Sequence, residues 1–167
     1  MKEIKMLTLD TSTTCTGIAK WTNGKLISST VLSTDKKLKG DDKLNQMITL
    51  VINNIKQENP QIVVTEQLAV TRNAVTVGML KELLGAIRGY CVTNHIDYYS
   101  LRPSEWRKSV SIFFNQKPNG RKRDDQKAWA IDIVNNKLGI CTESDDQAES
   151  ILLGIGYGNL FKCTMSI

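Results

Sequence analysis

Residues 5–21 constrain the fold of this chain most, because they place an acidic residue inside a run of strand-forming residues. Apolar residues lead to Asp10, a turn of small polar residues follows, and a second strand-like run ends at Trp21. Asn23-Gly24 favours a tight hairpin, and residues 25–33 read as a third strand. An ionised carboxylate in the middle of a sheet is costly without a partner. Asp10 is therefore expected to hold a cation, unless it only caps the turn that follows.

The chain has 167 residues, of which 41% are hydrophobic and 23% charged, as expected for one globular domain spanning residues 1–167. No apolar run approaches the roughly 18 residues of a membrane span, and no signal peptide is recognised, so we expect a cytoplasmic protein without membrane contact. The four cysteines form no Cys-x-x-Cys pair, which argues against a zinc or redox site. The single histidine argues against catalysis by a histidine dyad or triad.

Positive charge is concentrated in residues 102–127. This segment holds eight basic residues and three acids, an excess of five that equals the net charge of the whole chain. A basic segment near an acidic site suits a polyanionic substrate, although a solvated lysine-rich surface would give the same pattern. The basic residues are Arg102, Arg107, Lys108, Lys117, Arg121, Lys122, Arg123 and Lys127.

Two helices and two strands are predicted between residues 41 and 101. Apolar residues at helical spacing follow Asp41 and Asp42, either of which is expected to cap a helix that ends before Pro60. Residues 61–66 then form a strand parallel to the first, which brings Glu66 near Asp10. A second helix over residues 77–93 carries three glycines, so it lies either in the core or at a dimer interface. Residues 96–101 form a fifth strand.

Three further helices are predicted in the last third of the chain. The first begins at Pro103 and is expected to be capped by Ser104. The second begins at Lys122 and is expected to extend to about residue 137, and the third begins at Ser144. Phe113 and Phe114 are expected in the core.

The last helix carries two acids on one face, because Asp146 and Glu149 are three residues apart. If this face packs on the sheet, both acids meet Asp10 and Glu66. Four converging carboxylates need cations, and all-oxygen ligands favour Mg²⁺ or Mn²⁺; two such ions about 3.5–4 Å apart serve phosphodiester hydrolysis in known enzymes. Each acid also has a simpler interpretation, as a helix cap, a surface charge or a strand-end residue.

The order of these features resembles the RuvC-type Holliday-junction resolvases of the RNase H-like superfamily. The most telling segments are residues 62–67 (IVVTEQ) and 145–152 (DDQAESIL). The resemblance covers residues 4–156 and implies an α/β fold. Its five-stranded mixed sheet has three antiparallel strands followed by two parallel ones and is flanked by helices. It also implies a metal-dependent endonuclease that acts as a homodimer on four-way and other branched DNA, without a nucleotide cofactor.

The resemblance assigns roles to particular residues. The metal-binding catalytic acids fall on Asp10, Glu66, Asp146 and Glu149, with two ions per site. The basic residues beside the scissile phosphate fall on Arg107 and Lys127, with Arg123 as the alternative to Lys127 and the register open by a few residues. The remaining DNA-binding candidates are Arg102, Lys108, Arg121 and Lys122.

This chain departs from the bacterial pattern at two positions. Glu149 stands where the bacterial enzymes have Asp, and whether Asp145 also binds metal is open. Ala69 stands where they carry an aromatic ring that stacks on a base. Because base stacking contributes about 1–3 kcal/mol, we expect weak sequence preference at the cut and activity on forks and flaps. A compact enzyme of this kind would suit a bacteriophage.

Two other classes fit part of the pattern. Residues 9–13 also resemble the start of actin-like ATPases, for which Gly154, Gly156 and Gly158 would be the candidate phosphate motif. A non-catalytic DNA-binding module would explain the basic segment alone. It would leave the acids unexplained, because acids that face DNA weaken binding.

Overall fold

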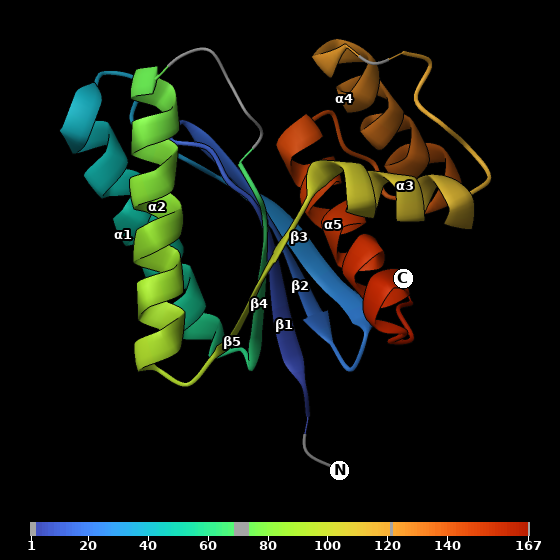
Figure 1. Ribbon diagram of the computed structural model, residues 1–167, viewed down its shortest axis with the longest axis horizontal. Helices are drawn as coiled ribbons and strands as arrows, with labels where there is room; N and C mark the ends of the chain where they lie inside the picture. The colour runs from blue at the N-terminus through green and yellow to red at the C-terminus, as the bar shows by residue number, and fades with distance from the viewer. Residues whose placement is uncertain (1–2, 69–73, 121, 167) are drawn as a thin grey trace.

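The computed structural model describes residues 3–68, 74–120 and 122–166. Five strands form one mixed sheet in the order β3-β2-β1-β4-β5 (Figure 1). The first three strands pair antiparallel, whereas β4 pairs parallel to β1 and β5 parallel to β4. The predicted sheet is therefore confirmed. The strands are β1 (Lys5–Asp10), β2 (Cys15–Thr22), β3 (Lys25–Ser33), β4 (Ile62–Glu66) and β5 (Asp97–Leu101).

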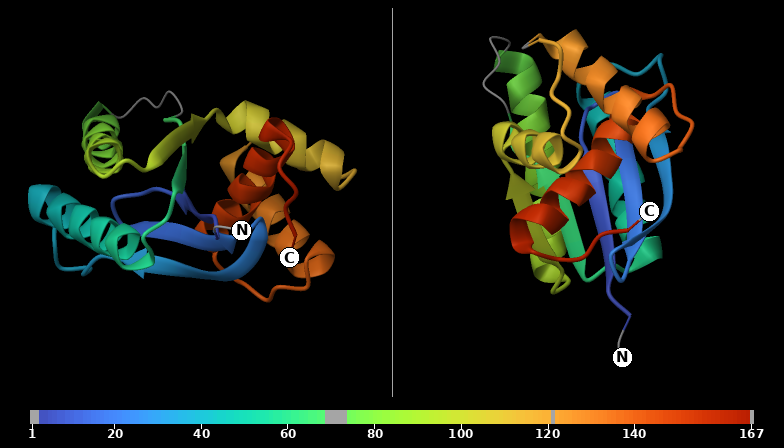
Figure 2. Two further views of the ribbon diagram at one scale, coloured as in Figure 1. Left: turned by 90° about the horizontal axis from the view of Figure 1, so that it is seen from below. Right: turned by 90° about the vertical axis from the view of Figure 1, so that its right-hand side faces the viewer.

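Helices cover both faces of the sheet. One face is covered by α1 (Gly40–Glu58) and α2 (Ala74–Thr93). The other is covered by α5 (Asp145–Phe161), on which α3 (Pro103–Phe113) and α4 (Arg123–Asp132) pack (Figures 1 and 2). None of the helices in the described residues is both long and apolar enough to cross a membrane.

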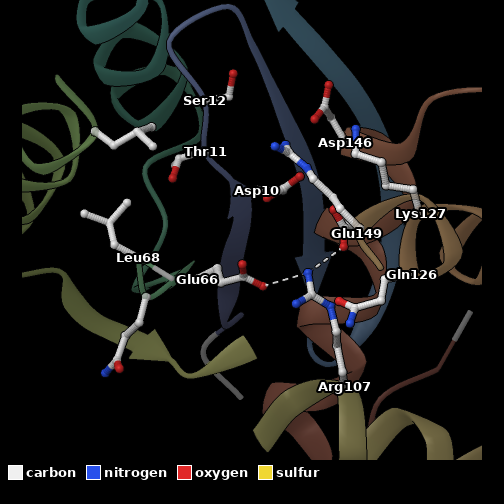
Figure 3. Close-up of a pocket in the computed structure, with 13 residues that line it drawn as sticks. Asp10, Thr11, Ser12, Glu66, Leu68, Arg107, Gln126, Lys127, Asp146 and Glu149 are labelled. Carbon is white, nitrogen blue, oxygen red and sulfur yellow. Dashed lines mark hydrogen bonds and ion pairs between the residues drawn. The ribbon is translucent and has the colours of Figure 1, made fainter. Parts of the chain in front are cut away.

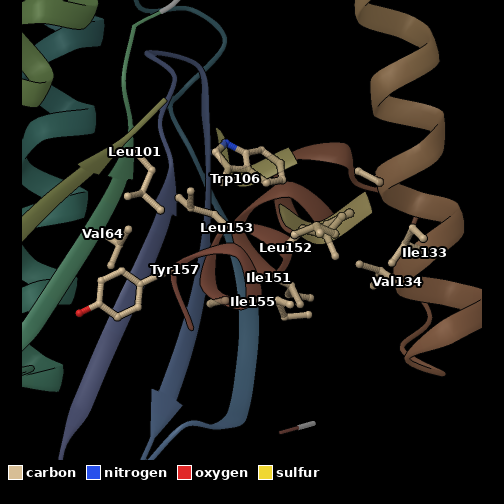
Figure 4. Close-up of a cluster of buried hydrophobic side chains, with 14 of the residues drawn as sticks. Val64, Leu101, Trp106, Ile133, Val134, Ile151, Leu152, Leu153, Ile155 and Tyr157 are labelled. Carbon is tan, nitrogen blue, oxygen red and sulfur yellow. The ribbon is translucent and has the colours of Figure 1, made fainter. Parts of the chain in front are cut away.

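The sheet separates two apolar cores, because neighbouring residues of a strand point to opposite faces. Leu7 and Leu9 of β1 pack with α1 and α2, whereas Met6 belongs to the core under α5. Figure 4 shows this second core, in which Val64 of β4 faces Tyr157 and the other apolar residues of α5. Each core fixes the helices on its own side of the sheet.

The register of β1 and β4 determines where the two strand-end acids lie. Leu9 is paired with Thr65 across the parallel ladder, and the next residues along the chain are Asp10 and Glu66. Both acids therefore end neighbouring strands at the same edge of the sheet, as the sequence predicts. Gly17 of β2 lies opposite Asp10 on the other side of β1.

Helix α5 is buried almost all round, which is typical of a helix in the centre of a domain. Its N-cap is Ser144, whose side chain accepts a hydrogen bond from the backbone N–H of Gln147 at 3.2 Å. The absence of side chains at Gly154 and Gly156 leaves room for the ring of Trp21 and for the Cβ and backbone of Trp106, respectively. These glycines are thus packing positions within a helix and form no phosphate-binding loop.

Several predicted boundaries differ from the structure. The N-cap of α1 is Lys39, which makes no side-chain cap bond; Asp41 and Asp42 lie in the first turn, where negative charge favours the helix dipole. The start of α3 at Pro103 is as predicted, but the cap predicted at Ser104 is wrong, because the N-cap residue is Arg102. The predicted helix from residue 122 to 137 is two pieces: α4 ends at Asp132, and a π-helical turn (Ile133–Lys137) continues it.

Candidate active site

A pocket of about 350 Å³ opens at the edge of the sheet where β1 and β4 end. All four predicted acids line it, and so do three basic side chains from α3 and α4 (Figure 3). The acids come from two strands and from α5, as the spacing of the sequence predicts. The charged residues that line the pocket are Asp10, Glu66, Asp146, Glu149, Arg107, Arg123 and Lys127.

Asp10 is the most strongly perturbed acid of the pocket. Burial raises the pKa of Asp10 well above its ordinary value, and the carboxylates of Glu149, Glu66 and Asp146 raise it further. Arg107 acts in the opposite direction. Asp10 is therefore close enough to the other three acids to be repelled by them, and this repulsion disfavours its ionised form.

Glu66 is held by two donors from α3. The indole N–H of Trp106 donates to Glu66 Oε2 at 2.6 Å, and Arg107 Nη2 lies 3.3 Å from the same oxygen. Burial raises the pKa of Glu66, whereas Arg107 and the Trp106 hydrogen bond lower it. Trp106 itself is only 1% exposed, so it is a buried support of the site and offers no surface to a DNA base.

Glu149 is buried and pairs with the same guanidinium. Arg107 Nη2 donates to Glu149 Oε1 at 2.6 Å, so one nitrogen lies between an acid of β4 and an acid of α5 (Figure 3). Sequence reasoning placed Arg107 beside the DNA phosphate. The structure shows in addition that Arg107 links two of the four acids.

Two contacts fix α5, and with it Asp146 and Glu149, against the sheet. Thr8 Oγ1 donates to the backbone carbonyl of Ser150 at 2.7 Å and accepts the indole N–H of Trp21 at 3.0 Å. At Gly17, a Cβ would overlap the backbone carbonyl oxygen of Asp146, so only glycine permits this approach between β2 and the start of α5. The two acids of α5 are thus placed by backbone contacts as well as by packing.

Lys127 of α4 forms an ion pair with Asp145, the acid next to Asp146. The hydrogen bond to Asp145 raises the pKa of Lys127. Burial raises the pKa of Asp146, the charge of Asp145 adds to this effect, and Lys127 opposes it. Asp145 therefore faces Lys127 in this structure, and the pocket is lined by Asp146.

Three other predicted DNA-binding residues do not line the pocket. Arg102, Lys108 and Lys122 are exposed, and Arg102 lies 3.6 Å from Glu105. Arg121 and Ala69 lie outside the described residues. Of the predicted basic set, the structure thus brings Arg107, Arg123 and Lys127 to the acids.

The pocket fits a divalent cation by the chemistry of its donors, which are carboxylate oxygens from Asp10, Glu66, Asp146 and Glu149. As the side chains are placed, no three Asp, Glu, His or Cys residues in the described ranges converge tightly enough to form a metal cluster. Arg107 accounts for part of this spacing, because its guanidinium lies between Glu66 and Glu149. The chemistry of the donor set is therefore suitable for a divalent cation.

Sequence reasoning missed the supporting roles of Trp106 and Thr8. Trp106 follows Pro103 in a short amphipathic helix, where a tryptophan reads as a core residue, and nothing in the spacing shows that its N–H meets Glu66. Thr8 lies two residues before Asp10 in the same strand, so it points to the same face; this alternation was the one available signal.

No protein-family model and no curated protein sequence matches the chain. Solved structures do match. The RuvC of Thermus thermophilus, solved in complex with a Holliday junction substrate, superposes with a TM-score of 0.71 at 12% identity over 95% of both chains. Another RuvC structure from Thermus thermophilus gives 0.69 at 12% identity over 95% of this chain and 96% of that one. The yeast mitochondrial Holliday junction resolvase Ydc2 gives 0.60 at 15% identity over 92% of this chain and 77% of that chain. The chain therefore has the RNase H-like fold of the RuvC-type Holliday junction resolvases.

Proposed function

We propose that this protein is a structure-specific endonuclease that hydrolyses phosphodiester bonds in Holliday junctions and other branched DNA. The observation that carries the proposal is the meeting of Asp10, Glu66, Asp146 and Glu149 in one pocket, at the strand ends of a RuvC-like fold. Basic residues on one side of this pocket supply the charge that a DNA phosphate needs.

The four carboxylates would hold Mg²⁺ or Mn²⁺, with two ions per site. Such ions would supply activation of a water molecule and stabilisation of the departing 3′ oxygen. Asp10 lies between Glu66 of β4 and the two acids of α5, which makes it the side chain best placed to share two ions (Figure 3). Arg123 and Lys127 line the same pocket from α4, and we assign to them the binding and orientation of the scissile phosphate.

The alternatives account for less of the structure. An actin-like ATPase needs a phosphate loop, but Gly154, Gly156 and Gly158 lie in the buried middle of α5. A non-catalytic DNA-binding module gives no reason to collect four mutually repelling acids beneath the basic residues.

The decisive experiment is nicking of a synthetic four-way junction in the presence of Mg²⁺ or Mn²⁺. Asp10→Asn and Glu66→Gln should lower the cleavage rate by at least about 10²-fold and preserve junction binding, because they remove ligands without adding bulk. Asp42→Asn, a matched loss of one acid on the exposed start of α1, should leave both unchanged. Equal cleavage rates for the wild type and both site variants would contradict the proposal.

Lys127 has its own test, because it also pairs with Asp145. If Lys127 contacts the scissile phosphate, Lys127→Ala should slow single-turnover cleavage more than it weakens junction binding. Asp145→Asn breaks the same ion pair and keeps the lysine, so it should have the smaller effect. An unchanged rate in Lys127→Ala would reject its placement at the phosphate.

We also propose weak sequence preference and a homodimer. The first rests on Ala69 in place of an aromatic residue, and mapping of cleavage positions on a mobile junction tests it. The second follows from the substrate, since two symmetric incisions in a nearly two-fold junction call for two active sites related by a two-fold axis.

A further inference from the structure

Arg107 is the cation that lies among the acids of the pocket. Its Nη2 is 2.6 Å from Glu149 Oε1 and 3.3 Å from Glu66 Oε2. Its guanidinium also lies 4.6 Å from the ring centre of Trp106, and the side chain is only 19% exposed. This is a partly buried cation held by two carboxylates and an aromatic face, unlike the exposed Arg102 and Lys108 on the same segment.

The other two basic side chains of the pocket do not bridge the acids in this way. Lys127 is paired with Asp145, which does not line the pocket, and Arg123 is exposed. An arginine stays charged at every accessible pH, so the guanidinium cannot leave its carboxylates by losing a proton. It leaves only by moving its side chain.

The oxygens that hold Arg107 belong to two of the four acids that would bind divalent ions. A carboxylate engaged by a guanidinium is neutralised and turned away from other cations, and both effects lower its affinity for Mg²⁺ or Mn²⁺. We propose that Arg107 is a built-in counterion that competes with divalent ions for Glu66 and Glu149, so that ion binding requires its side chain to move out. This inference rests on the proposed metal-dependent function of the same pocket.

A purely structural role for Arg107 makes the opposite prediction. If the arginine only organises the ligands, its removal disorders the site and weakens ion binding. If it competes with the ions, its removal strengthens ion binding even though cleavage falls. Ion affinity in the absence of DNA therefore separates the two roles, whereas cleavage activity does not.

The experiment measures Mn²⁺ binding to the purified full chain without DNA, by calorimetry and by the electron paramagnetic resonance signal of free Mn²⁺. Arg107→Gln is expected to bind Mn²⁺ about tenfold more tightly than wild type, a size typical of coupling between competing ligands. Lys108→Gln removes the same charge from the neighbouring exposed residue, and its Mn²⁺ affinity should stay within about twofold of wild type.

The outcomes separate this inference from the proposed function. Absence of Mn²⁺ binding by wild type and Arg107→Gln alike would overturn the metal-dependent function. Binding by wild type with equal or weaker binding by Arg107→Gln would overturn the competition alone.

If Arg107→Gln folds only when Mn²⁺ is present, the need for a cation at this position is shown directly. If it does not fold at all, Arg107→Lys decides. Its ammonium nitrogen is one bond nearer the backbone than Nη2 and reaches the two acids less well, so tighter Mn²⁺ binding than wild type supports competition, and equal or weaker binding rejects it.

Discussion

Trp106 is a buried residue that holds Glu66, one of the proposed metal-binding acids. Its N–H donates to Glu66 Oε2 at 2.6 Å, and its Cβ and backbone pack where Gly156 has no side chain. Trp106→Phe keeps most of the ring and deletes the N–H, so Glu66 loses a donor that fixes its direction. We expect a loss of about 1–3 kcal/mol of folding stability and a clear drop in cleavage rate. Urea unfolding and single-turnover cleavage measure the two effects.

Trp129 is the matched control for this substitution. It is 4% exposed, and its N–H donates to the backbone carbonyl of Gln116 at 3.2 Å, away from the pocket. Trp129→Phe should cost similar stability and leave the cleavage rate of the folded protein near that of wild type. Equal loss of rate in the two variants would show that Trp106 acts only through stability.

Asp10 should destabilise the metal-free protein at neutral pH. Its pKa is raised above that of the unfolded chain. At low pH, where the carboxyl is protonated, it costs no stability, and the free energy of unfolding falls as the pH rises through the raised pKa. Asp10→Asn cannot ionise. In EDTA at about pH 8, the variant should be more stable by about 0.5–2 kcal/mol, and the difference should shrink towards pH 4. Thermal unfolding across this range measures it; a less stable variant at pH 8 would contradict the prediction.

At the residue scale, the sequence revealed the acids better than their partners. Asp10 and Glu66 each end an apolar strand, and Asp146 and Glu149 share a helix face, so local pattern was enough to group them. Arg107 was expected at a phosphate, because the sequence shows that the residue is charged but does not show which way its side chain points. Its position between Glu66 and Glu149 depends on how α3 docks on α5, which no local pattern encodes.

The contact between β2 and α5 at Gly17 sets the position of a whole element. A Cβ there meets the backbone carbonyl of Asp146, and a backbone cannot move aside as a flexible side chain can. Gly17→Ala should displace the start of α5, reduce stability by about 1–3 kcal/mol and slow cleavage. Ser28→Thr adds a methyl group at an exposed position of β3 and should change stability by less than about 0.5 kcal/mol. Denaturant midpoints compare the two; a fully stable Gly17→Ala would refute the role of this contact.

At the element scale, long periodic segments were predictable and their ends were not. The break between α4 and the π-helical turn at Ile133 has no sequence signal, because the apolar spacing runs through it. Phe113 was expected in the core but is 61% exposed, since α3 extends to that residue and turns it outward. Tertiary packing decides both points.

At the scale of the molecule, topology followed from a few strong signals. The Asn23-Gly24 hairpin and the helical crossover to β4 determine the order of four strands, and the structure has that order. Identity with the solved resolvases is only 12–15%, so this chain reaches the same fold through these patterns although it shares few residues with them. The pattern of one chain, however, says little about which surface meets a second copy.

The exposed face of α2 is the surface that we expect to carry the proposed homodimer. Val75 is 73% and Val92 64% exposed, and a Cβ on any of the three glycines between them would meet open space. The positions on this face follow one another at alternating steps of three and four residues, which is the spacing found in a helix that pairs with another helix. Its positions are Val75, Gly78, Glu82, Gly85, Gly89 and Val92.

A two-fold axis beside Gly85 would pair these helices antiparallel and place Gly78 of one copy opposite Val92 of the other, since each is seven residues from the axis. Gly85→Glu puts two like charges and two bulky side chains at that axis and should produce a monomer in light scattering at micromolar concentration. Ile27→Glu, at an exposed apolar position on β3, should remain dimeric. The monomer should lose the paired incision of a junction before it loses single nicks, because each pocket draws its acids from one chain. A monomeric wild type, or a dimeric Gly85→Glu, would remove α2 from the interface.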